Sequence, residues 1–224
     1  MSTHGFAAVL PRLLQNTDTI QALMVTCNFA AWDSGGWTEA LPDIRRLRKD
    51  GVGIVAMKPL MGGMGETPAG RSALAEALKT PAGRTRVMSA ALRWVLQNAL
   101  VDTVPLLIKN QEELAASTTA AAGGLTDADM RLLAAAVREA SPRLCRLCPT
   151  CSAGCRSGLP IPEIMRALMY AEGYGNLPRA KRAYADLVGG APVAKCESCP
   201  GCTADCPNQV RVHDRMLSAR THLA

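Results

Sequence analysis

The chain has 224 residues, 48% of them hydrophobic and 20% charged, so it can bury a substantial core. The formal net charge of +6 could suit nucleic acid, but the aromatic residues (4%) are too few for a stacking surface, and the basic run at 45–49 has the pattern of a solvated helix face. For these reasons we expect no nucleic-acid partner. Because no run of about 18 apolar residues occurs, we also expect no membrane span and a cytoplasmic protein.

Short apolar runs alternate with amphipathic segments in the first 140 residues. The runs at 22–27, 51–57 and 103–108 are too short for helices and predict strands, whereas 37–49, 69–79 and 85–98 predict helices. Strands that are apolar on both faces are typical of a parallel sheet covered by helices. The pattern therefore predicts an α/β fold, and periodicity alone leaves open whether the sheet is open or closed into a barrel.

A helix start follows at Thr126, which with Asp129 has the pattern of an N-terminal cap. This helix leads directly into a cysteine-rich segment. We therefore expect two domains, residues 1–140 and residues 141–224.

Eight of the nine cysteines form two copies of the pattern C-x2-C-x2-C-x3-C, and every cysteine recurs 51 residues later. Three thiolates within seven residues can hold three irons of a cubane, and the fourth approaches a cluster from another direction, so the pattern predicts two 4Fe-4S clusters. A disulfide framework fits poorly with this length, the odd cysteine count and the lack of a signal segment. Structural zinc usually uses two separated C-x2-C pairs. The predicted metal ligands are Cys145, Cys148, Cys151, Cys155, Cys196, Cys199, Cys202 and Cys206.

The fourth cysteine of each run binds the other cluster in two-cluster ferredoxins. On that pattern Cys206 joins the first three cysteines of the first run, and Cys155 joins the first three of the second. Pro207 follows the second run as the ferredoxin pattern expects, whereas Arg156 follows the first. The ninth cysteine, Cys27, lies in an apolar run and is predicted to be a buried small hydrophobe.

The repeat continues beyond the cysteines, because Leu159 aligns with Val210 and Met165 with Met216. Each cysteine run is thus expected to lead into a helix, and another helix is expected at about 178–188. This arrangement resembles the α-helical ferredoxin modules of redox enzymes.

Three segments before residue 140 carry a second resemblance. The stretch GVGIVAMKPLMGG at 51–63 is similar to the seventh strand and following loop of the aldo/keto reductases. The stretch ALRWVLQN at 91–98 resembles the helix before the last strand of that family, and VDTVPLLI at 101–108 resembles the last strand. With the cysteines behind them, the chain is similar to the iron-sulfur branch of that family. The resemblance implies the C-terminal part of a (β/α)8 TIM barrel followed by an α-helical ferredoxin-like domain.

The same resemblance implies the loops that grip NADP in that family, with Lys58, Gly62, Gly63, Lys109 and Asn110 as contact residues. It implies no catalytic residue here, because the Asp, Tyr, Lys and His tetrad comes from the first four strands. A partial barrel would expose strand edges, so we expect a missing half, self-association or a truncated product.

Two functional hypotheses follow. The chain is either an iron-sulfur oxidoreductase that resembles the aldo/keto reductases, or an electron-transfer module or fragment with no independent activity. The partner is expected to be a redox protein or a small-molecule substrate.

Overall fold

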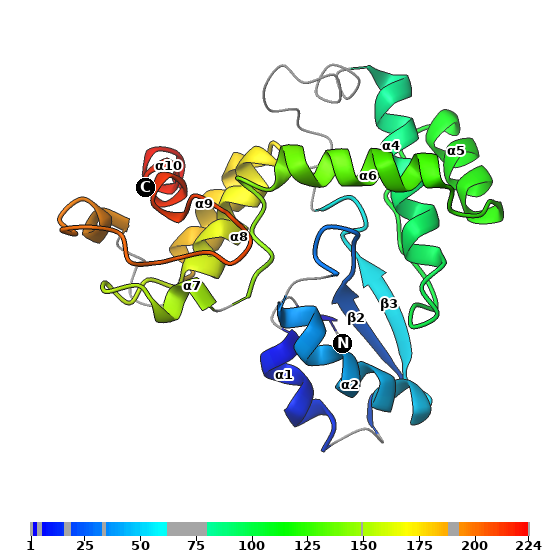
Figure 1. The fold of residues 1–224 in the computed structure, drawn as a ribbon, viewed down its shortest axis with the longest axis horizontal. Helices are drawn as coiled ribbons and strands as arrows, with labels where there is room; N and C mark the ends of the chain where they lie inside the picture. Colours follow the sequence, from blue (N-terminus) through cyan, green and yellow to red (C-terminus); the bar gives the residue numbers. More distant parts are fainter. Residues whose placement is uncertain are drawn as a thin grey trace. The chain divides into compact units, whose positions relative to one another are not determined.

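The computed structural model describes residues 2–3, 6–15, 19–32, 35–61, 80–148, 150–187 and 193–223. These residues are mostly helical and divide into two compact units (Figure 1), of which the first ends at Glu139 and the second begins at Ala140.

A parallel sheet forms the centre of the first unit. Strand β2 (Ala22–Thr26) lies between the two-residue β1 (Ser2–Thr3) and β3 (Gly53–Met57). Strands β2 and β3 pair over five residues, from Ala22 opposite Gly53 to Thr26 opposite Met57. The strands predicted at 22–27 and 51–57 are therefore confirmed.

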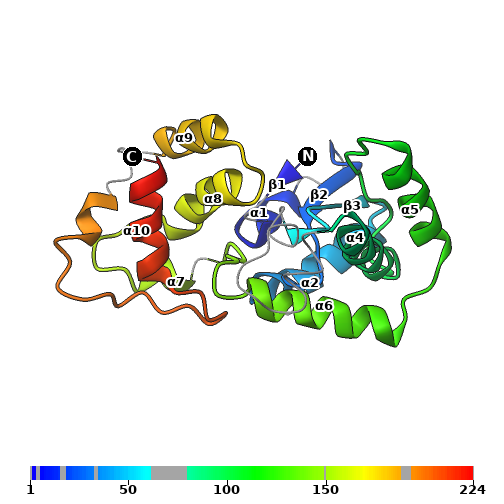
Figure 2. The ribbon, with the colours of Figure 1, turned by 90° about the horizontal axis from the view of Figure 1, so that it is seen from above.

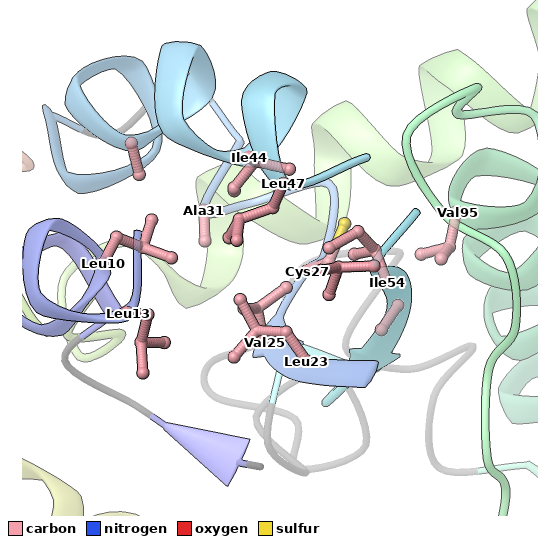
Figure 3. Close-up of a cluster of buried hydrophobic side chains, with 13 residues drawn as sticks. Leu10, Leu13, Leu23, Val25, Cys27, Ala31, Ile44, Leu47, Ile54 and Val95 are labelled. Atoms are coloured by element: carbon pink, nitrogen blue, oxygen red, sulfur yellow. The ribbon is translucent and has the colours of Figure 1, made fainter. Parts of the chain in front are cut away.

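Helices cover this sheet and close its core. Figure 3 shows side chains of α1 (Phe6–Leu13), α2 (Gly35–Lys49), β2, β3 and α4 (Pro81–Leu96) meeting in one apolar cluster. In α2, Ile44 and Leu47 are fully buried, while the basic residues between and after them face solvent or form surface ion pairs. The helices predicted at 37–49 and 85–98 are present, and the one predicted at 69–79 lies outside the described residues.

The predicted fold class is wrong. Within the part of the chain that the structure describes, two five-residue strands and β1 make one open sheet, not the C-terminal part of a (β/α)8 barrel followed by a ferredoxin-like domain. Of the strand predicted at 103–108, only Thr103 pairs with β3, through a single bridge to Val55. Pro105 has no N–H to donate to a ladder, and Leu107 is 83% exposed, so sheet pairing stops at this edge.

The second unit consists of short helices around the cysteine runs. They are α7 (Thr150–Ala153), α8 (Ile161–Glu172), α9 (Leu177–Ala185), the 3-10 helix η3 (Val193–Cys196) and α10 (Val212–Leu223). Helix α8 packs against both α9 and α10 (Figure 2). Helix α9 confirms the helix predicted near 178–188. Among the described residues no helix has the length and apolar character needed to cross a membrane.

Two further helices complete the first unit, α5 (Gln111–Ala122) and α6 (Asp127–Ala140). The predicted cap of α6 is confirmed, because the Asp129 N–H donates to Thr126 Oγ1 at 3.2 Å and the Thr126 N–H donates to Asp129 Oδ2 at 3.0 Å. Arg93 of α4 donates two hydrogen bonds to the same carboxylate, at 2.6 and 2.9 Å. Hydrogen bonding from Arg93 is the main reason that the pKa of Asp129 falls to about 2.

We expect Asp129→Ala to lower the free energy of unfolding by about 1–2 kcal/mol, because both the cap and the Arg93 pair are lost. The depressed pKa stabilises the fold above the ordinary carboxyl pKa, so the difference between wild type and variant should be full above about pH 4 and should shrink as the pH falls toward 2. Asp127→Ala, in the same helical turn but exposed, is the control. Equal denaturation midpoints for the two variants would contradict this assignment.

Candidate metal centre

The cysteine thiols lie in two sets, and each set draws on both runs. The pKa of Cys145 is raised to about 12, first by burial and further by repulsion from the thiolates of Cys151, Cys148 and Cys206. Burial likewise raises the pKa of Cys151 to about 11, and repulsion from the Cys206 thiolate is the next largest cause. Thiols influence one another in this way only when they are close together. We call this group the first thiol set; its members are Cys145, Cys148, Cys151 and Cys206.

The second thiol set is the reciprocal group. The pKa of Cys196 is raised by burial and by its thiol neighbours Cys155, Cys202 and Cys199. These four cysteines line one open depression together with Arg156, Ser157, Thr203, Ala204 and His213. The thiols that the spacing predicts to share a cluster therefore lie together in both cases, with the fourth cysteine supplied by the other run. The second thiol set consists of Cys155, Cys196, Cys199 and Cys202.

The backbone after each run has the same shape. Gly158 and Gln209, which are 51 residues apart, both adopt left-handed backbone conformations, with φ of 61° and 62°. Their N–H groups donate to the carbonyl oxygens of Cys155 and Cys206, at 3.0 and 2.9 Å. The following helices, α8 and α10, begin and end 51 residues apart. The structural repeat predicted from the sequence is thus confirmed.

The two sets differ in exposure. Cys148 and Cys151 of the first set are 8% and 4% exposed, whereas the second set has no buried member and Cys202 is exposed. The first set also receives N–H contacts to sulfur: the Leu147 N–H donates to Cys145 Sγ at 3.3 Å, and Asn208 Nδ2 donates to Cys148 Sγ at 3.9 Å. Such donors stabilise a thiolate, because they favour the charged form of the sulfur. The first thiol set is therefore less exposed to water than the second, and its sulfur atoms receive hydrogen bonds from protein N–H groups.

The donor chemistry fits iron-sulfur clusters. Over the described ranges, no three His, Cys, Asp or Glu side chains surround a point that would hold a single metal ion. A cubane makes a different demand, because each of its four irons takes one thiolate and the four ligands approach from four directions. Two groups of four thiols, each group spread over two loops, meet that demand by number and by residue type.

The residues predicted to contact NADP are not brought together into a binding site by the contacts that the described residues make. Lys58 directly follows β3 in a left-handed conformation, and its carbonyl oxygen accepts from Asn28 Nδ2 at 3.1 Å. Asn110 is the N-cap of α5, where its side chain accepts from the Glu113 N–H at 2.8 Å. Lys109 precedes that cap and is exposed. The other two predicted contacts, Gly62 and Gly63, lie outside the described residues. The geometry thus gives Asn110 a helix-capping role.

Asn28 was not among the predicted site residues. It is 4% exposed and its Oδ1 accepts from the backbone N–H groups of Ala30 and Ala31, at 3.1 and 2.9 Å. Together with the bond to the Lys58 carbonyl, these contacts tie the ends of β2 and β3 together. Its role is structural, and the preceding Cys27 is fully buried with its pKa raised to about 12 by that burial, as the apolar run predicts.

Sequence reasoning also missed a buried ion pair that joins the two helices of the repeat. Arg215 of α10 donates to both carboxylate oxygens of Glu172 on α8, at 2.9 and 2.7 Å, and Ser218 Oγ lies 3.3 Å from the same carboxylate. The side chains of Arg215 and Glu172 are only 9% and 19% exposed. A signal was available, because Arg215 occupies the repeat position of the fully buried Ile164.

Comparison of the chain with models of known protein families, with curated proteins and with solved structures found no match. The resemblance to the aldo/keto reductases stays a prediction.

We expect Glu172→Ala to lower the free energy of unfolding by about 3 kcal/mol, because it leaves the Arg215 guanidinium buried without its carboxylate. Glu163→Ala on the exposed face of the same helix should change it by less than about 0.5 kcal/mol. Replacing both Glu172 and Arg215 by leucine should recover most of the loss, because no unpaired charge then remains. Urea denaturation measures all four proteins, and a loss no larger than that of Glu163→Ala would contradict the buried pair.

Proposed function

We propose that this chain binds two 4Fe-4S clusters through the two thiol sets and serves as an electron-transfer protein. The observation that carries the proposal is the crossed grouping of the thiols, in which each set takes three cysteines from one run and the fourth from the other. Each bound cluster takes up and releases one electron at a time. A carbonyl reductase activity rests on the family resemblance alone and is not part of the proposal.

The charge of the second unit supports this assignment. Residues 140–224 contain eleven Arg and Lys against six Asp and Glu, so most of the chain's excess positive charge lies around the cysteines. A 4Fe-4S cluster with four thiolates carries a charge of about −2, and nearby cations offset it. The negative charge of the two proposed clusters thus accounts for the basic composition of this unit, and no polyanionic partner is needed to explain it.

Protein purified or reconstituted without oxygen should hold about eight irons and about eight acid-labile sulfides per chain, and no zinc. Cys27→Ser should leave this content unchanged, because Cys27 is fully buried in the first unit. Iron and sulfide assays with metal analysis make the measurement. Colourless protein, or protein with one zinc per set, would contradict the proposal.

Single Cys→Ser variants test the crossed grouping. If ligation is crossed, Cys206→Ser should perturb the same cluster as Cys145→Ser, and Cys155→Ser the same cluster as Cys196→Ser. Redox titration followed by EPR should therefore sort the four variants into these two pairs, each with one altered potential. Pairing by run, with Cys206→Ser matching Cys196→Ser, would contradict the proposed crossed ligation.

A further inference from the structure

Two residues that lie between cysteines, Gly154 of the first run and Thr203 of the second, are in contact. Thr203 Oγ1 donates to the carbonyl oxygen of Gly154 at 2.6 Å. The two backbones also approach closely here. A methyl group on Gly154 would lie 2.8 Å from the Thr203 carbonyl oxygen and 3.6 Å from Ala204 Cα. Only a glycine permits this approach without displacing backbone.

The contact lies where each run passes from one thiol set to the other. Gly154 stands between Cys151 of the first set and Cys155 of the second. Thr203 stands in the opposite run between Cys202 of the second set and Cys206 of the first. The chain segments that connect the two sets therefore cross at this contact.

From this position we infer that Gly154 and Thr203 are positioning residues that fix the separation of the two thiol sets, and hence the coupling between the two clusters. This inference rests on the proposed function. The repeat shows that the contact is made on one side: Ser152, which occupies the position of Thr203 in the first run, instead accepts from the N–H of Ile161, the first residue of α8, at 3.2 Å. Thr203 instead donates to the other run. The Thr203 hydroxyl and the lack of a side chain at Gly154 thus keep the two connecting segments in contact.

The test uses the reconstituted full chain and compares Gly154→Ala and Thr203→Val with two matched controls. Gly201→Ala lies in the same run as Thr203, but nothing stands within 4 Å of the added methyl. Thr203→Ser keeps the donor hydroxyl. The readouts are iron content and the EPR spectrum of the fully reduced protein, in which two interacting clusters give split and broadened features.

Gly154→Ala and Thr203→Val should keep the iron content of the wild type and lose the split features, whereas Gly201→Ala and Thr203→Ser should keep both. If Gly154→Ala does not fold, Thr203→Val carries the test, because it adds no atom that must be accommodated at the backbone contact. Wild-type spectra in both test variants at full iron content would overturn the inference and leave the proposed function standing. An iron-free wild type would overturn both.

Discussion

The fourth cysteine of each run constrains the whole second unit. A tight C-x2-C-x2-C loop presents three thiols to one centre, and the next cysteine, four positions further on, belongs to the other thiol set. Each set is complete only when the other run lies beside it, so neither run can form a four-thiol set alone. Both runs must then fold as one body, and the contacts of Gly154 with Thr203 and of Glu172 with Arg215 bring together residues more than 40 positions apart in the sequence.

Burial of the thiols adds a free-energy cost to forming thiolates in this unit. Raised pKa values at Cys145 and Cys151 mean that the fold alone disfavours the thiolate forms that a cluster requires. Iron, if bound as we propose, would supply the opposing attraction, and donors such as the Leu147 N–H lower the cost of the thiolate form. The left-handed conformations at Leu147 and Gln209, which carry side chains, show that the loop backbones adopt unfavourable torsion angles to place these groups.

Local patterns were predictable from the sequence, and closure of the sheet was not. The cysteine spacing, the 51-residue repeat and the Thr126–Asp129 cap depend on residues near one another in the chain, and each is present. The barrel depends on pairing between distant strands, and βα alternation is the same for an open sheet and a closed one. At 103–108 the apolar run suited a strand, but Pro105 lacks a donor and the chain leaves β3 after Thr103.

The same repeat that unites the two runs also makes them unequal. Positions related by 51 residues hold Ile164 and Arg215, or Pro162 and His213, so equal backbones carry different side chains. One result is a drier first set with N–H donors to sulfur. The other is a second set that opens to solvent beside Arg156 and His213. Exposure, charge and hydrogen bonds to sulfur all tune cluster potentials. Two clusters bound as proposed would therefore differ in potential despite their identical cysteine spacing, because the second set is the more exposed of the two.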